Sequence, residues 1–71
     1  MMDDTRPIKA GYRFADKDRR SAGRVVETTG RVRYGKHEVV VTEAPLTPDV
    51  VGRRSFVSES TLRAKYERVS R

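Results

Sequence analysis

The sequence predicts a small, mainly β protein that folds as one domain. Its 71 residues leave room for one thin core, because a chain of this size buries only about 60% of its unfolded surface. Ten of the apolar residues are valines, a β-branched type that is enriched in strands. The segment 23–44 holds two alternating apolar and polar runs joined by a short link, which is the pattern of a β-hairpin.

Before this hairpin the chain carries weaker signals. Residues 1–10 are polar and unpatterned, and they are expected to form a flexible N-terminal arm. A short edge strand should follow, with Tyr12 and Phe14 on one face because strand residues alternate with a period of two. The polar segment 16–21 predicts a tight turn, in which Asp side chains accept hydrogen bonds from backbone N–H groups. In the next strand, Val26 is expected to face the core.

Gly35-Lys36 is the predicted turn of the hairpin. A two-residue link with glycine first is typical of a type II′ turn, because glycine adopts positive φ at no steric cost. This register would place Arg33 opposite Glu38, a favourable pair of opposite charges across two strands. Just before the hairpin, Thr29-Gly30 predicts a bend or β-bulge.

After the hairpin, two prolines predict a loop over 44–52, since proline cannot donate to a sheet ladder. Segment 53–58 should form a strand that points Phe56 into the core. Residues 58–61 offer the side-chain caps of one short helical turn. A short final strand at 67–69 would complete the fold. The predicted core includes Val39, Val41, Phe56 and Leu62.

These elements together are the outline of a small SH3-like β-barrel. It would have four to five antiparallel strands, a long loop, and one short helical turn before the last strand. The domain would span residues 11–69, between the arm at 1–10 and a C-terminal tail at 70–71. An OB-fold is less compatible, because it is usually longer and places its helix in the middle of the chain.

Three short patterns run along the chain. They are Asp16-x-Asp18-x-Arg20-x-x-Gly23-Arg24-x-Val26, Val51-Gly52-Arg53-Arg54, and Leu62-x-x-x-Tyr66. Together they resemble, over residues 14–69, a group of small proteins of actinobacteria and their phages that are mostly of uncharacterised function. The resemblance implies an SH3-like fold and no activity.

The net charge of +6 is unevenly distributed. Residues 5–36 carry ten bases against three acids, 37–52 carry three acids and no Lys or Arg, and 53–71 carry six bases against two acids. Twelve of the sixteen bases are Arg, which forms bidentate contacts with phosphate and stacks on planar groups. This pattern predicts a non-catalytic domain that binds DNA or RNA. Its Arg-rich face would consist of Arg19, Arg20, Arg24, Arg31, Arg33, Arg53 and Arg54.

Aromatic residues would add to such a face. Any of Tyr12, Tyr34 or Tyr66 would stack on bases if its ring were exposed. Against this interpretation, an Arg-rich composition can also reflect a GC-rich genome and a charged face that only keeps the protein in solution.

The acidic segment supports an alternative function. A phage or bacterial adaptor would bind a host protein through Glu38, Glu43 and Asp49, since SH3-like barrels are scaffolds whose function depends on their loops. With acidic and basic faces on one domain, a monomer or a weak homo-oligomer is expected.

No enzymatic, metal or cofactor site is expected. The chain has no cysteine, and its single histidine, His37, lacks a visible catalytic partner. Asp16-x-Asp18 has the spacing that begins a calcium loop, but the glycine and distant glutamate of an EF-hand are missing. The N-terminus is too polar for a signal peptide, and no run reaches the ~18 apolar residues of a membrane helix. We therefore expect a soluble cytoplasmic protein, located in the host cytoplasm if a phage encodes it.

Overall fold

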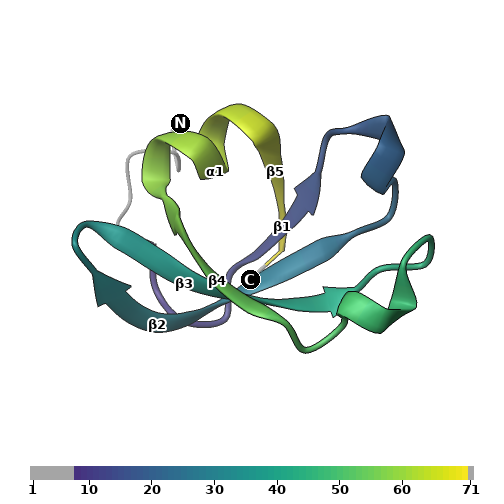
Figure 1. Cartoon of the computed structure of the whole chain (residues 1–71). Coiled ribbons are helices and arrows are strands. Elements are labelled where there is room, and N and C mark those ends of the chain that lie inside the picture. Colours follow the sequence, from purple (N-terminus) through teal and green to yellow (C-terminus); the bar gives the residue numbers. More distant parts are fainter. Residues whose placement is uncertain (1–7, 71) are drawn as a thin grey trace.

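Five strands and one helix form the framework of the protein (Figure 1). The computed structural model describes residues 8–70; residues 1–7 of the predicted arm at 1–10, and Arg71 of the predicted tail at 70–71, lie outside the described residues. Two single-turn 3-10 helices, η2 and η3, lie in the longer loops. The elements are β1 (Arg13–Asp16), η2 (Arg19–Ser21), β2 (Val25–Arg33), β3 (Lys36–Glu43), η3 (Pro48–Val50), β4 (Arg54–Ser58), α1 (Glu59–Lys65) and β5 (Tyr66–Ser70).

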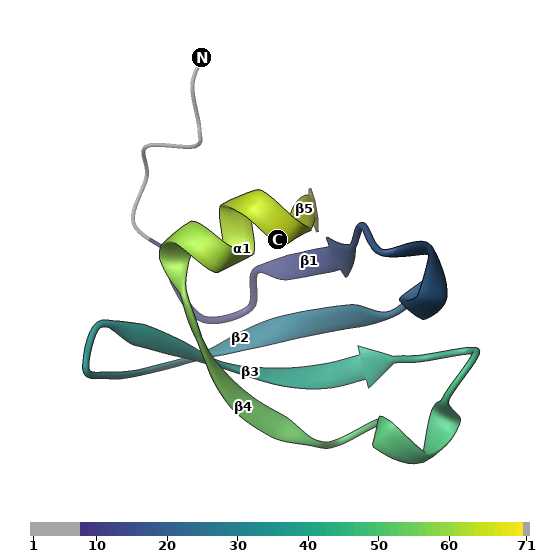
Figure 2. The same ribbon diagram turned by 45° about the horizontal axis from the view of Figure 1, so that its top comes forward.

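The strands form one antiparallel sheet in the order β4-β3-β2-β1-β5. This confirms the mainly β class, the antiparallel strands and the helix before the last strand. In the part of the chain that the structure describes, no ladder joins β4 to β5, so the sheet is not closed into a barrel. The predicted edge position of the first strand is wrong: α1 carries the chain across one face and returns it alongside β1, which pairs on both sides (Figure 2).

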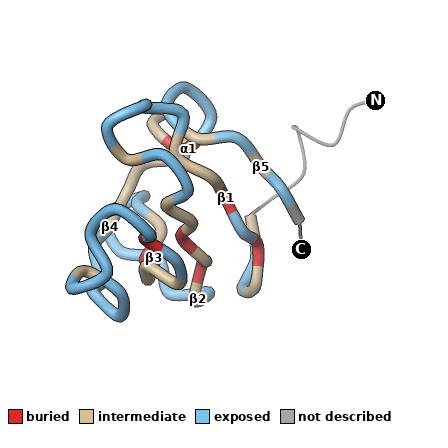
Figure 3. Tube along the Cα trace, turned by 90° about the vertical axis from the view of Figure 1, so that its right-hand side faces the viewer, coloured by how far each residue is buried: buried red, intermediate tan, exposed pale blue. Residues whose placement is uncertain are grey.

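The core lies between the inner face of the sheet and α1, where the buried positions gather (Figure 3). The predicted inward positions of Val26, Val39 and Leu62 are confirmed, and Val41 packs at the margin. Tyr12 and Phe14, which were predicted only to share one face of their strand, both lie in the core. Ile8 also packs against the core, so the chain joins the fold before residue 11. The buried cluster consists of Tyr12, Phe14, Val26, Val39 and Leu62.

Phe56 does not belong to this core, and its predicted inward orientation is wrong. The β3–β4 ladder pairs Val57 with His37 on the inner face and Phe56 with Glu38 on the outer face. Successive strand residues point to opposite faces, so only one of two adjacent apolar residues can enter the core. Val57 packs against the core, and Phe56 is half-buried on the opposite side of the sheet.

The hairpin turn is Tyr34-Gly35 rather than Gly35-Lys36. Tyr34 and Gly35 have φ values of 54° and 75°, and a type I′ turn requires positive φ at both of its central residues. The ladder therefore pairs Arg33 with Lys36, and the predicted opposition of Arg33 and Glu38 is wrong.

A bulge in β2 lies between the turn and the rest of the ladder. Between the pairs Thr28–Val39 and Val32–His37, β2 contains residues 29–31 where β3 contains Glu38 alone. These two extra residues in β2 place the turn at 34–35, one residue later than the Thr28–Val39 pairing alone would give and one residue before the predicted turn. The bulge itself was predicted at Thr29-Gly30, and this is confirmed by the register shift and by the φ of 94° at Gly30.

The short helix is fixed at its start, as predicted. The backbone N–H of Thr61 donates to Ser58 Oγ at 3.2 Å, which is the expected N-terminal cap. The Glu59 carboxylate accepts from Arg63 Nε at 3.0 Å and lies 3.9 Å from His37 Nε2 on β3. His37 thus connects the sheet to α1 beside the cap.

Candidate nucleic-acid interface

The arginines predicted to bind nucleic acid occupy two ends of the sheet. The turn between β2 and β3 lies at the left of Figures 1 and 2, and the loops that carry η2 and η3 lie at the right. Arg24 and Arg31 are separated by most of β2, which at about 3.3 Å per residue spans roughly 20 Å. The structure therefore brings Arg31 and Arg33 together at the hairpin. It places Arg19, Arg20 and Arg24 around η2, and Arg53 and Arg54 at the start of β4.

The tip of the hairpin is cationic and free of acids. Residues 29–37 contain no Asp or Glu, and within residues 8–70 no carboxylate lies within ion-pair distance of Arg31, Arg33 or Lys36. Tyr34 projects from the turn and is 95% exposed. An almost fully exposed aromatic ring is thus flanked along the hairpin by three positively charged residues.

The outer face of the sheet extends this surface. The Arg33 guanidinium carbon lies 5.4 Å from the centre of the Phe56 ring on β4, a cation–π contact. Arg54 lies two residues from Phe56 and therefore on the same face. On β3, the strand between β2 and β4, the side chain of Glu38 is only 6% exposed and accepts a hydrogen bond from Thr29 Oγ1 at 2.7 Å. We call the combined set the hairpin surface: Arg31, Arg33, Tyr34, Lys36, Arg54 and Phe56.

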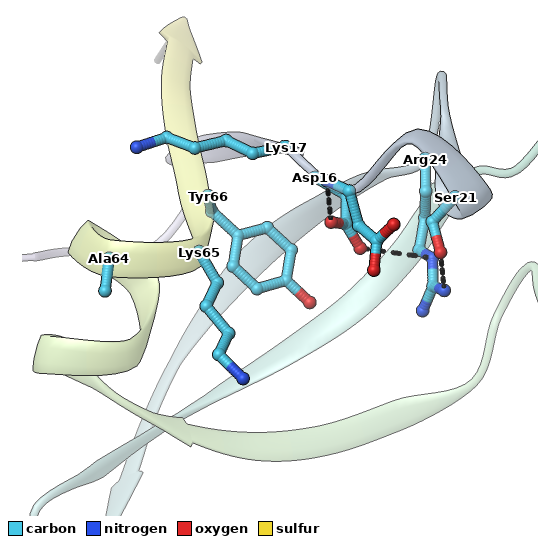
Figure 4. Close-up of a pocket in the computed structure, with 8 residues that line it drawn as sticks. Asp16, Lys17, Ser21, Arg24, Ala64, Lys65 and Tyr66 are labelled. Atoms are coloured by element: carbon cyan, nitrogen blue, oxygen red, sulfur yellow. Dashed lines mark hydrogen bonds and ion pairs between the residues drawn. The ribbon is translucent and has the colours of Figure 1, made fainter.

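Around η2, two arginines are engaged by carboxylates. Arg24 Nε lies 3.7 Å from Asp16 Oδ2, and its Nη2 donates to Ser21 Oγ at 2.6 Å (Figure 4). Arg20 Nη2 lies 3.1 Å from Asp18 Oδ2, and the hydrogen bonds from Arg20 lower the pKa of Asp18. These contacts fix the β1–β2 turn, so Arg20 and Arg24 offer less free positive charge than the hairpin does.

The same two aspartates cap backbone groups, as predicted. Asp16 Oδ1 accepts from the N–H of Asp18, and Asp18 Oδ1 accepts from the N–H of Arg20, both at 2.9 Å. Within the described range 8–70, no group of three or more His, Cys, Asp or Glu side chains is arranged to hold a metal ion. The Asp pair therefore has a local structural role in the turn.

An open hollow of about 490 Å³ lies between η2 and the junction of α1 with β5 (Figure 4). Its walls include the Asp16 carboxylate, the Arg24 guanidinium and the Tyr66 ring, with Lys17 and Lys65 also lining it. Burial raises the pKa of the Tyr66 hydroxyl, and the negative charge of Asp16 adds to this effect. With both signs of charge in its walls, the hollow favours no particular class of ligand.

The alternative, acidic surface is smaller than expected. Burial removes Glu38 from it, while Glu43 and Asp49 are exposed beside the β3–β4 loop. The same loop exposes two apolar side chains, Leu46 at 60% and Val51 at 48%.

Of the tyrosines considered for stacking, the structure distinguishes Tyr34. Tyr12 is buried in the core, and Tyr66 is half-buried beside the hollow. Sequence reasoning did not assign Lys36 or Phe56 to the interface, because it placed Lys36 inside the turn and Phe56 in the core. The Tyr34-Gly35 dipeptide is the signal for the correct turn, since glycine is the usual second residue of a type I′ turn.

No protein-family model, curated protein or solved structure matches the chain. The resemblance to small proteins of actinobacteria and their phages therefore stays a prediction. Among residues 8–70, no helix has the length and apolar character needed to cross a lipid bilayer.

Proposed function

We propose that this chain is a non-catalytic nucleic-acid-binding domain and that the hairpin surface is its interface. The observation that carries the proposal is the group of three cations without carboxylate partners, Arg31, Arg33 and Lys36, around the exposed ring of Tyr34. Phosphates neutralised by such cations release counterions, and this release drives much of the binding. The remaining charges favour the same partner, because the whole chain carries +6.

We further propose that the open sheet is a variant of the SH3-like fold, from an actinobacterial or phage genome, that acts in the cytoplasm. The strand order β4-β3-β2-β1-β5 and the short helix before the last strand support the fold. The three sequence patterns described above support the origin.

The test is a fluorescence-anisotropy titration against mixed-sequence DNA and RNA over a range of salt concentrations. A variant with Arg31→Gln, Arg33→Gln and Lys36→Gln should bind far more weakly than the parent. It should also lower the slope of log K against log salt by roughly 2 to 3, because each lost phosphate contact contributes about 0.7 to 0.9.

A matched variant controls for net charge. Lys17→Gln, Arg19→Gln and Lys65→Gln remove the same charge from exposed positions near η2. This control should retain most of the affinity. If the two triple variants lost affinity equally, the hairpin surface would not be the interface. If the parent showed no binding at low salt, the proposed function would be overturned.

A protein-binding adaptor is the second candidate, favoured by the exposed Leu46 and Val51 beside Glu43 and Asp49. Exposed apolar side chains rimmed by polar ones are common at protein interfaces. A pull-down from nuclease-treated lysate tests it with the parent and with a Leu46→Ser, Val51→Ser variant. A partner that survives nuclease and is lost in this variant would support the adaptor, and a partner that disappears with nuclease would support nucleic-acid binding.

A further inference from the structure

We infer that the hairpin surface takes a single-stranded nucleic acid, with one base stacked on the ring of Tyr34; this inference rests on the proposed function. The first support is exposure. Tyr34 is 95% exposed at the tip of the β2–β3 turn, so its ring contributes almost nothing to the packing of the domain. Both faces of the ring are open to a planar partner.

The backbone at Tyr34 supports the inference independently. Its φ of 54° lies in the left-handed region, which bulky residues rarely adopt. The first central position of a type I′ turn strongly prefers Asn, Asp or Gly. Tyrosine at this position therefore costs backbone strain and adds no packing that would offset it. Because backbone strain is concentrated at functional sites, a strained and exposed aromatic residue points to a ligand.

The chemistry around the ring selects a single strand. Stacking on an exposed aromatic ring requires a base whose face is free, and the bases of a duplex cover one another. Arg33 and Lys36 are paired across the ladder directly beside the turn, and Arg31 lies two residues away. Phosphates on either side of a stacked base would therefore meet a cation. The Arg33 guanidinium also lies 5.4 Å from the centre of the Phe56 ring, so the cationic surface continues from the turn onto the outer face of the sheet.

The experiment compares Tyr34→Asn with Tyr34→Phe. Asparagine is preferred at this turn position, so Tyr34→Asn should fold at least as well as the parent, which a thermal melt by circular dichroism verifies. Phenylalanine keeps the aromatic ring in the same strained backbone. The probes are a labelled oligo(dT) single strand and a labelled mixed-sequence DNA duplex, each titrated by fluorescence anisotropy.

Tyr34→Asn should weaken binding of oligo(dT) by about 5- to 150-fold, the range expected for one lost base–aromatic stack. Tyr34→Phe should bind oligo(dT) like the parent, and neither variant should change the affinity for the duplex. Equal losses on both probes, or no loss on oligo(dT), would overturn the single-strand inference. If the triple variant Arg31→Gln, Arg33→Gln, Lys36→Gln nevertheless binds both probes far more weakly than the parent, the proposed function stands without the single-strand inference. If the parent binds neither probe, both proposals fail.

Discussion

Leu62 offers the sharpest test of the packing of α1 on the sheet. Its side chain is 0% exposed and belongs to the cluster with Tyr12, Phe14, Val26 and Val39. Leu62→Ala removes buried methyl groups and leaves a cavity, a change that costs about 2–5 kcal/mol. The helix is held by its Ser58 cap and by the strand that follows at once, so it has little freedom to collapse into the cavity. We therefore expect the upper half of this range, about 3–5 kcal/mol.

This loss is large against the whole stability of the domain. A chain of 71 residues is expected to have an unfolding free energy of roughly 4–11 kcal/mol. Each kcal/mol moves the melting temperature of such a domain by about 4–8 °C, so Leu62→Ala should melt at least 10 °C below the parent. Thermal and guanidinium unfolding, followed by circular dichroism, measure the difference.

Leu46→Ala is the matched control, because it removes the same atoms from a side chain that is 60% exposed. It should change the unfolding free energy by no more than about 0.5 kcal/mol. The packing described for α1 would be refuted if the two variants were equally destabilised, or if Leu62→Ala melted with the parent.

Two further predictions concern the ends of α1. Ser58→Ala should lower the unfolding free energy by about 1 kcal/mol through loss of the cap on the N–H of Thr61. Ser60→Ala, two residues further on, removes only an exposed hydroxyl contact to Ser58 and leaves that cap in place, so it should cost less; guanidinium unfolding of both variants measures the difference. Burial and the charge of Asp16 raise the pKa of Tyr66 above its ordinary value of 10.0, so the unfolded chain loses this proton first as the pH rises. The stability that Tyr66 contributes is thus complete below pH 10 and declines above it, and Tyr66→Phe should flatten this decline in unfolding curves measured below and above pH 10. Parallel curves for the parent and Tyr66→Phe would contradict the assignment.

The strands and most of the core could be predicted because their signals are local. Alternation placed Tyr12 and Phe14 on one face, which the structure buries, and the residues from Ser58 to Thr61 marked the start of the helix. Two features depended on contacts that the sequence does not reveal. The turn register depends on how many residues the bulge at Gly30 adds to β2, and the ladder with β3 decides which of two adjacent apolar residues of β4 enters the core.

The site could be predicted in part for a similar reason. Charge counting gives equal weight to every arginine, but Arg20 and Arg24 are engaged by aspartates, and the pairing of Arg24 with Asp16 follows from the folded turn. The exposure of Tyr34 could not be read from the sequence while the turn was placed one residue later.

The pairing of β1 with β5 has a consequence for how the domain folds. The neighbours β2, β3 and β4 follow one another along the chain, whereas Phe14 on β1 pairs with Arg68 on β5, 54 positions later. Closing so long a loop costs more entropy than forming a hairpin, so this ladder should form last. Arg68, whose guanidinium carbon lies 4.2 Å from the centre of the Tyr12 ring, covers that ring only when β5 has docked. In this order of folding, we expect Tyr12 to stay open to water until β5 docks and Arg68 covers its ring.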